Sequence, residues 1–314
     1  MSDALVYYTN LISAFILLCI GIPGNLLILH YFLIKCWKRL NSYYIFINYL
    51  AVTDLLVCFC RSFTVLTTSL SPNSTLADFV CQNSWNTPIG LSAASVLILC
   101  GLSFDRYRKI TKPFTKDLPR RMIHFICLAP VFLAPVIYIP YNQQSQMDRE
   151  TGICHSNKNP SYSLVVLTFT LHLLFLCIIP ITLIFIFNWK IAKTLQHQHQ
   201  ANDIKQQDVL QRNTRAMRTI KWLTISASVT VFTPNVILTI LYTACVVTNH
   251  MLIVTLEVLS VTRNLVFMNS AINVFVYWLR VKEFKEYYVG LFSLKDLQFK
   301  NNGRSRISKV QQPS

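Results

Sequence analysis

Charged residues are scarce in this sequence. Asp, Glu, Lys and Arg make up 13% of its 314 residues, whereas soluble domains carry roughly 25%. Acidic residues are the rarer sign, with 13 Asp and Glu beside 29 Lys and Arg, so the net charge is +16. Hydrophobic residues make up 53% of the chain. This composition argues against a soluble domain and predicts a membrane protein.

Sequence patterns typical of metal sites, nucleic-acid binding and enzymes are missing as well. None of the ten cysteines stands in Cys-x-x-Cys or Cys/His metal spacing, and most lie singly in apolar runs as small hydrophobic residues. Basic chains often bind nucleic acid, but here the basic residues lie in short segments between apolar runs, so we expect no nucleic-acid partner. No nucleophile–base pair emerges either, so we expect no enzyme.

Seven apolar segments are long enough to span a membrane. They are residues 6–34, 42–68, 78–107, 120–140, 161–189, 217–247 and 252–279. Several contain proline, which packed transmembrane helices tolerate because neighbouring groups satisfy the freed backbone. The sequence therefore predicts an all-α integral membrane protein built as a seven-transmembrane helix bundle.

The chain divides at the ends of this bundle. Residues 1–5 form a short extracellular N-terminus, and residues 6–280 form the membrane domain. Residues 281–292 carry Phe284, Tyr288 and Leu291 at helical spacing, which indicates a short amphipathic helix on the membrane surface. The polar, basic residues 293–314 are expected to form a disordered cytoplasmic tail.

Basic residues set the expected orientation. All of the 29 Lys and Arg lie on one side of the membrane except Arg61, Arg149, Lys158 and Arg263. Because cytoplasmic loops carry the excess of Lys and Arg, we expect a plasma-membrane protein with its N-terminus outside and its C-terminus in the cytoplasm.

Two features of the expected outer side agree with this orientation. Asn73-Ser74-Thr75 is a glycosylation acceptor. Cys81 and Cys154 both fall where disulfides persist, and Cys154 is the single cysteine of the 141–160 loop. A bridge between them is favoured over two free thiols.

A set of short motifs appears in order along the seven segments. They are Gly24-Asn25, Leu50 to Asp54, Cys81, Asp105-Arg106-Tyr107, Ile110, Pro113-Phe114, Pro180, Phe232-Thr233-Pro234, Asn269-Ser270 and Asn273 to Tyr277. Over residues 5–292 the chain resembles the rhodopsin-like (class A) G-protein-coupled receptors. The sequence around Asp105 and Pro113 is most similar to that of invertebrate peptide receptors of the family.

The resemblance implies a switch at the cytoplasmic face. Arg106 is similar to the activation arginine of the family, which pairs with Asp105 at rest and is released to meet a heterotrimeric G protein. An interfacial arginine without that role is the alternative. The remaining members of the implied coupling surface and switch are Tyr107, Pro113, Phe114, Asn273 and Tyr277.

The resemblance also implies a sodium pocket around Asp54. A carboxylate at mid-membrane is costly without polar company, and a hard cation prefers oxygen ligands. Its implied partners are Ser95, Asn269, Ser270 and Asn273. A purely structural polar cluster is the alternative. No other cofactor or metal is expected.

Some positions depart from the family pattern. Phe232 stands where the family has a tryptophan toggle, and Val274 stands where proline is usual. No acidic residue lies near Thr214 to restrain Arg106, so basal activity is expected. No cysteine follows the amphipathic helix, so its apolar side chains must anchor it.

The sequence constrains the identity of the ligand less than it constrains the fold. Amine receptors of the family carry an Asp seven residues after the segment-three cysteine, and here that residue is Pro88. Arg61 and Arg263 should face the cavity and meet an anion, unless Glu257 neutralises Arg263. Together with Phe232 these residues make the candidate ligand site.

We expect a receptor for an extracellular ligand, with a neuropeptide as the first candidate and a small anionic molecule as the second. Membrane lipids and a G protein are the other expected partners, and arrestin is a further one. A non-signalling seven-helix protein is one alternative. A transporter or channel is less favoured because no repeat is present.

Overall fold

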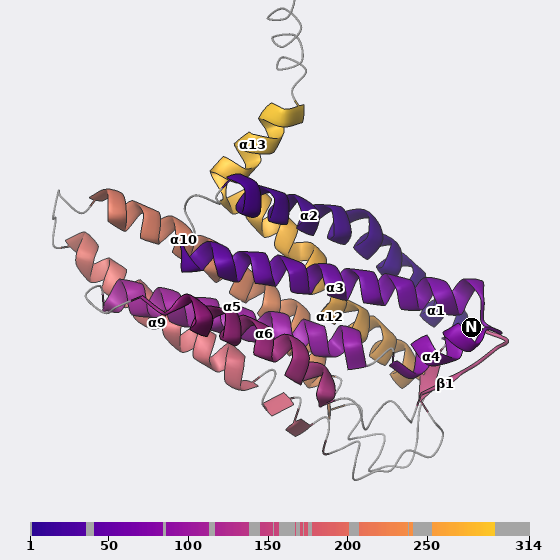
Figure 1. The fold of residues 1–314 in the computed structure, drawn as a ribbon. Helices are drawn as coiled ribbons and strands as arrows, with labels where there is room; N and C mark the ends of the chain where they lie inside the picture. The colour runs from indigo at the N-terminus through magenta and orange to yellow at the C-terminus, as the bar shows by residue number, and fades with distance from the viewer. Residues whose placement is uncertain are drawn as a thin grey trace, which may run out of the picture.

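The fold was analysed in a computed structural model. It describes residues 2–35, 41–83, 86–112, 117–137, 145–152, 154–156, 167, 170–171, 173–174, 178–200, 207–237, 239–240 and 253–292. These residues form a bundle of long helices packed side by side (Figure 1). The N-terminus, α4 and β1 lie at one end of the bundle, which we call the α4 end. The end of α9, the start of α10 and the start of α3 lie at the opposite end, which we call the α13 end because α13 leaves the bundle on that side.

The first membrane segment is a continuous series of helical pieces. It comprises α1 (Ser2–Ile16), η1 (Leu17–Gly21), α2 (Ile22–His30) and η2 (Tyr31–Lys35), where η denotes a π-helical turn. The second segment is α3 (Ser42–Leu70), which begins at Asn41. The Asn41 side chain accepts a hydrogen bond from the Tyr43 backbone N–H at 3.4 Å, as expected of an N-cap residue.

The third and fourth segments differ from their predicted bounds. The single segment expected over 78–107 is described as two helices, α4 (Thr75–Asn83) and α5 (Asn86–Thr111), with residues 84–85 outside the described part. Cys81 therefore belongs to α4, while Asp105 lies near the end of α5. The fourth segment, α6 (Arg120–Val136), ends before the predicted residue 140, and residues 138–144 are not described.

The last segments are longer than their apolar cores. They are α9 (Ile179–Gln200), α10 (Gln207–Ala227), η6 (Ser228–Phe232), α12 (Ile253–Arg280) and α13 (Lys282–Phe292). Hydropathy predicted an end at 189 and a start at 217, but α9 continues to Gln200 and α10 begins at Gln207. These extensions are rich in Gln, Lys and Arg, which favour helix without being apolar. The amphipathic helix expected over 281–292 is present as α13.

Two π-helical turns stand directly before prolines. The Ile22 N–H bonds to the Leu17 carbonyl just before Pro23, and the Thr233 N–H bonds to the Ser228 carbonyl just before Pro234. Proline removes one backbone donor and crowds the preceding turn. The wider turn accommodates the proline within a continuous helix, which is a known cause of local helix distortion.

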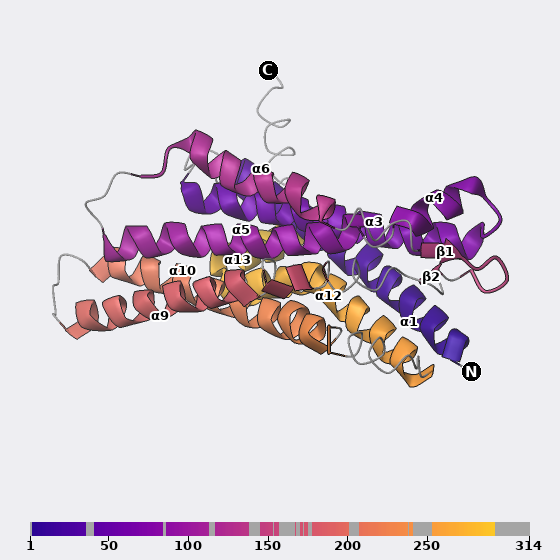
Figure 2. The ribbon, with the colours of Figure 1, turned by 90° about the horizontal axis from the view of Figure 1, so that it is seen from below.

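Three stretches of the described chain are long and apolar enough to cross a membrane on their own: Ala4–Ile34, Ser42–Leu70 and Thr75–Thr111. Large apolar side chains also point away from the bundle, as lipid-facing residues do. They include Phe15, Phe59, Phe125, Phe132 and Phe185. The bundle interior holds α3 against α5, and α5 against α6 and α9 (Figure 2).

The first and last membrane segments approach closely at Gly24. A Cβ atom on Gly24 would lie 2.5 Å from Val274 Cγ2 and 2.6 Å from Val274 Cγ1. Any larger residue at position 24 would therefore collide with the branched side chain on α12. This contact explains the need for glycine at this position.

A short hairpin is the one addition to the helices among the described residues. β1 (Ser145–Met147) pairs antiparallel with β2 (Cys154–Ser156), and Met147 lies opposite Cys154. Asp148 orders the turn, because its carboxylate accepts hydrogen bonds from the Glu150 N–H at 2.9 Å and the Thr151 hydroxyl at 2.8 Å. The Asp148 carboxylate is thus engaged within its own loop.

Candidate functional site

A buried carboxylate lies in the middle of the bundle. Asp54 on α3 is fully buried, and Ser95 on α5 donates to its Oδ1 at 3.0 Å. From α12, Ser270 donates to Oδ1 at 2.9 Å and Asn273 donates to Oδ2 at 2.7 Å. Three donors offset the cost of burying the carboxylate. Three of the four partners expected for Asp54 therefore contact it.

The fourth expected partner has a different contact. The Asn269 side-chain oxygen accepts a hydrogen bond from the Thr230 hydroxyl of η6 at 3.0 Å. On the other side, Asn25 of α2 donates to the Ser270 carbonyl at 2.9 Å. The polar cluster thus joins α2, α3, α5, η6 and α12. Sequence reasoning missed Thr230, because nothing in its neighbourhood indicates which way it faces.

The chemistry of this cluster is suited to a hard cation. The hydroxyl oxygens of Ser95 and Ser270 both lie within 3.0 Å of Asp54 Oδ1, and hard cations prefer oxygen ligands. In the described part of the chain, no group of three or more His, Cys, Asp and Glu side chains could hold a metal ion. The oxygen atoms around Asp54 could serve as ligands of a sodium ion, and sodium binding here stays a prediction.

A second charged cluster lies at the α13 end. Arg106 Nη2 lies 3.3 Å from Asp105 Oδ2, and both side chains are almost fully buried. The same carboxylate oxygen accepts a hydrogen bond from the Ser42 hydroxyl at 2.7 Å. Lys109 donates to Ser42 at 2.7 Å and lies 3.2 Å from Asp117. Asp105 and Arg106 are thus paired in this structure, and their role as the resting arrangement of a switch stays a prediction.

The start of α3 completes the surroundings of Arg106. Arg106 Nη2 donates to the Asn41 side chain at 3.4 Å, and its guanidinium carbon lies 4.8 Å from the centre of the Tyr43 ring. Sequence reasoning missed Asn41, Ser42 and Tyr43. The sequence did carry a signal, because Asn before a helical apolar run is a typical N-cap.

The other residues of the expected switch lie nearby or outside the described part. Tyr107 stacks on Phe187 with ring centres 5.3 Å apart. Tyr277 is buried, and its hydroxyl has no hydrogen-bond partner. Pro113 and Phe114 lie outside the described residues, so their positions stay predictions.

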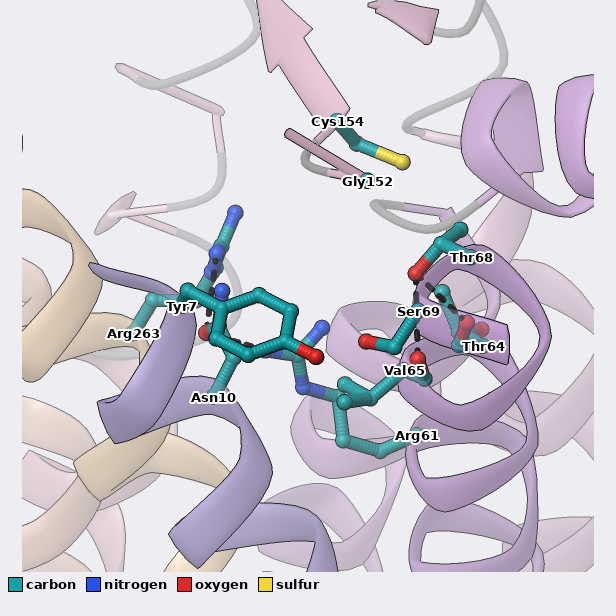
Figure 3. Close-up of a pocket in the computed structure, with 10 residues that line it drawn as sticks. All are labelled: Tyr7, Asn10, Arg61, Thr64, Val65, Thr68, Ser69, Gly152, Cys154 and Arg263. Atoms are coloured by element: carbon teal, nitrogen blue, oxygen red, sulfur yellow. Dashed lines mark hydrogen bonds between the residues drawn. The ribbon is translucent and has the colours of Figure 1, made fainter. Parts of the chain in front are cut away.

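The third cluster surrounds a small pocket of about 30 Å³ at the α4 end (Figure 3). Arg61 of α3 and Arg263 of α12 both reach toward Asn10 of α1. Arg61 Nη2 donates to Asn10 Oδ1 at 2.8 Å and to Asn264 Oδ1 at 3.0 Å. Arg263 Nη2 donates to the same Asn10 oxygen at 3.4 Å. The structure thus brings together the two arginines that the sequence placed in the ligand site.

Two other members of the expected ligand site are not seen in this pocket. Phe232 ends η6, is partly buried and does not line the pocket. Glu257 belongs to α12, but its side chain lies outside the described part of the chain, so its expected pairing with Arg263 stays a prediction. Sequence reasoning missed Asn10 and Asn264, since a single Asn in an apolar segment does not reveal its orientation.

The β1–β2 hairpin covers this pocket. A disulfide joins Cys81 of α4 to Cys154 of β2, with Cα atoms 5.6 Å apart, as the sequence predicted. Gly152 has a positive φ of 68°, and a Cβ there would lie 3.1 Å from the Thr68 carbonyl oxygen on α3. Glycine thus allows the turn to rest directly on α3. Asn73, the expected glycosylation acceptor, is exposed in the turn before α4.

Comparison with known proteins shows which family the chain belongs to. Residues 24–277 match the family model described as 7 transmembrane receptor (rhodopsin family). The chain belongs to this family. Family membership confirms the predicted seven-helix membrane architecture, and it supports a receptor rather than an enzyme.

Two relatives of this rhodopsin-family receptor are amine receptors by name. It is 29% identical over 176 residues to the octopamine receptor beta-1R of Drosophila melanogaster, covering 52% of this chain and 34% of the relative. It is 29% identical over 164 residues to the alpha-1A adrenergic receptor of Cavia porcellus, covering 48% of this chain and 33% of the relative. The match therefore spans about a third of the length of each relative.

Proposed function

We propose that this rhodopsin-family receptor binds an extracellular ligand at its α4 end and activates a heterotrimeric G protein at its α13 end. In this proposal the N-terminus lies outside the cell and the C-terminus in the cytoplasm, as the distribution of Lys and Arg favours. The observation that carries the proposal is the buried ion pair between Asp105 and Arg106, next to the start of α3. Arg106 Nη2 lies 3.3 Å from Asp105 Oδ2.

The pair has the properties of a switch. Apart from Asp105, the contacts of Arg106 among the described residues are weak, namely a 3.4 Å hydrogen bond to Asn41 and the Tyr43 ring. Releasing Arg106 toward a bound partner therefore costs little beyond one ion pair. The Tyr277 hydroxyl is buried without a partner, and an unmet donor costs about 1–3 kcal/mol. A rearrangement that satisfied Tyr277 would favour the second state.

The test is G-protein activation in transfected cells, measured for each Gα class as dissociation from Gβγ and normalised to receptor at the cell surface. Wild type is expected to show basal activity, and Arg106→Ala should lose it. Arg108→Ala is the matched control, because Arg108 lies on the same helix near the ring of Phe104, and it should retain activity.

Two results would contradict this function. One is activity that persists in Arg106→Ala at equal surface expression. The other is no activation by wild type, either basally or with panels of peptides and biogenic amines. Ion flux that survives Arg106→Ala would instead support a transporter or channel.

We further propose that the ligand is a neuropeptide rather than an amine. The names of the two relatives favour an amine, but Pro88 stands where amine receptors of the family carry aspartate. The described residues that line the pocket include two arginines and no acidic side chain, and these arginines would repel a cationic amine. Activation by the peptide panel and not by the amine panel is the expected result.

A further inference from the structure

We propose that Arg61, with Asn10, Asn264 and Arg263, forms a subsite for a carboxylate group of the ligand. This inference rests on the proposed receptor function and names the chemistry of its ligand. It commits to an anionic group and leaves two sources of it, the free C-terminus of a peptide and a small carboxylic acid.

The first argument is the charge of Arg61. Its side chain is buried, with 4% exposed. Among the described residues, its contacts are the oxygens of Asn10 and Asn264 and the ring of Phe267, whose centre lies 5.0 Å from the guanidinium carbon. All three are neutral, and Arg61 Nε has no hydrogen-bond partner. A buried charge is costly unless a counter-charge is present, so Arg61 is suited to receive an anion.

The second argument is the convergence of donors. Three donors meet at the single side-chain oxygen of Asn10: Arg61 at 2.8 Å, Asn264 at 3.1 Å and Arg263 at 3.4 Å. An amide oxygen is neutral and has two lone pairs. A carboxylate brings two oxygens with about four acceptor positions. It would offer these donors more acceptor positions and place a negative charge between the two guanidinium groups.

The third argument is access. A second, larger pocket of about 420 Å³ adjoins the first and shares Tyr7, Ser69 and Gly152 with it. Its lining adds Tyr8 and Glu150, among others. A ligand could therefore place its carboxylate at Arg61 and extend past Tyr7 into the wider space beneath the hairpin. Figure 3 shows Tyr7 next to both arginines.

The decisive experiment introduces a carboxylate into the proposed subsite by mutation of the receptor itself. Asn10→Asp puts an acid where the three donors converge, so the purified full-length receptor in nanodiscs should unfold at a higher temperature, by roughly 2–4 °C. Arg61→Gln should remove that gain when combined with Asn10→Asp. Asn83→Asp, on the exposed Asn83 of α4, is the matched control and should leave the unfolding temperature unchanged. A lower or unchanged unfolding temperature for Asn10→Asp overturns the proposal.

A second arm identifies the source of the carboxylate. Thermal shift is measured with peptides in free-acid and amidated forms, and with aliphatic and aromatic carboxylic acids beside their methyl esters. We expect a shift with acids of one set and none with the matched amides or esters. Arg61→Gln should weaken the response about tenfold or more, as loss of a charge-assisted hydrogen bond does. Arg149→Gln, at an exposed arginine of the hairpin turn that lines neither pocket, should preserve the response.

Outcomes of this arm separate the hypotheses. Equal responses to acids and to their esters or amides overturn the subsite, as does a panel without any response. Loss of the response in Arg149→Gln, with retention in Arg61→Gln, also overturns it. Because thermal shift needs no G protein, a failure of G-protein activation would contradict the proposed function without deciding this test.

Discussion

At the scale of single residues, Asp54 shows how one buried charge organises several helices. Its two oxygens accept hydrogen bonds from α5 and α12, and Asn25 extends the network to α2. The hydroxyls of Ser95 and Ser270 donate to the carboxylate here. The same hydroxyl oxygens could instead face a cation, because a hydroxyl both donates and accepts.

We predict that Asp54→Asn abolishes the effect of sodium. In wild type, replacing potassium chloride by sodium chloride at equal ionic strength should raise the unfolding temperature of the purified receptor, because the cation binds the folded state. The variant keeps the shape of the side chain but loses its charge, so the two salts should give the same temperature.

Matched serines control this measurement. Ser95→Ala removes an oxygen beside Asp54 and should weaken the sodium response. Ser92→Ala should not, because the Ser92 hydroxyl bonds to the Pro88 carbonyl within its own helix. If the sodium response is undiminished in Asp54→Asn, the polar cluster around Asp54 is purely structural.

At the scale of elements, α13 is held to the first membrane segment by buried side chains. Phe284 and Tyr288 are each 1% exposed. The Tyr288 hydroxyl donates to the Leu27 carbonyl at 2.7 Å and lies 2.9 Å from His30 Nδ1. Burial, with a smaller effect of Tyr287, raises the pKa of Tyr288 to about 12. The phenol therefore remains a donor throughout the physiological range.

We predict that Tyr288→Phe loosens α13 without unfolding it. The variant keeps the buried ring but loses a hydrogen bond of about 1 kcal/mol. The amides of α13 should therefore exchange hydrogen roughly fivefold faster in nanodiscs. Val289→Ala, at a half-exposed position of the same helix, should leave exchange unchanged. Unchanged exchange in Tyr288→Phe would show that Phe284 alone anchors α13.

Sequence predicted the elements better than their ends. Apolar length and charge bias are local properties, so the segments that became α3, α12 and α13 were predicted nearly residue by residue. The π-helical turns before Pro23 and Pro234 depend on how neighbouring helices tolerate a proline, which hydropathy does not report. The polar extensions of α9 and α10 were missed for the same reason, because only apolar residues were counted.

At the scale of the whole molecule, α10 is joined to α12 and α13 at the α13 end. The guanidinium carbon of Arg280 lies 4.4 Å from the centre of the Trp222 ring. Arg215 and Glu283 form an exposed ion pair at 3.9 Å. The sequence offered no acid near Thr214 to restrain Arg106, so basal activity was expected. The contacts of Arg280 with Trp222 and of Arg215 with Glu283 instead hold α10 to α12 and α13, without involving Arg106.

We predict that Arg280→Ala raises basal G-protein activation about two- to fivefold, because an exposed cation–π contact contributes about 0.5–1 kcal/mol. Activation is measured at equal surface expression. Trp222→Ala should behave alike, and both changes together should add nothing further. Lys221→Ala, at the exposed neighbouring position, is the control. Unchanged or reduced basal activity in Arg280→Ala would show that this contact does not restrain α10.

The candidate sites were predicted only as far as residue type allows. Asp54, Arg61, Arg106 and Arg263 stood out because charge in an apolar segment is costly. Their neutral partners, such as Asn10 and Thr230, did not stand out. Whether such a residue faces the interior depends on the rotation of each helix about its axis, and that rotation is set by packing across the whole bundle.

The close approach of α2 and α12 also limits how this sequence can change. A Cβ at position 24 would collide with both methyl groups of Val274. Positions 24 and 274 therefore cannot drift independently. Among descendants of this sequence, glycine should persist at 24 wherever a β-branched residue occupies 274. Alanine should become acceptable at 24 only after the residue at 274 has become smaller.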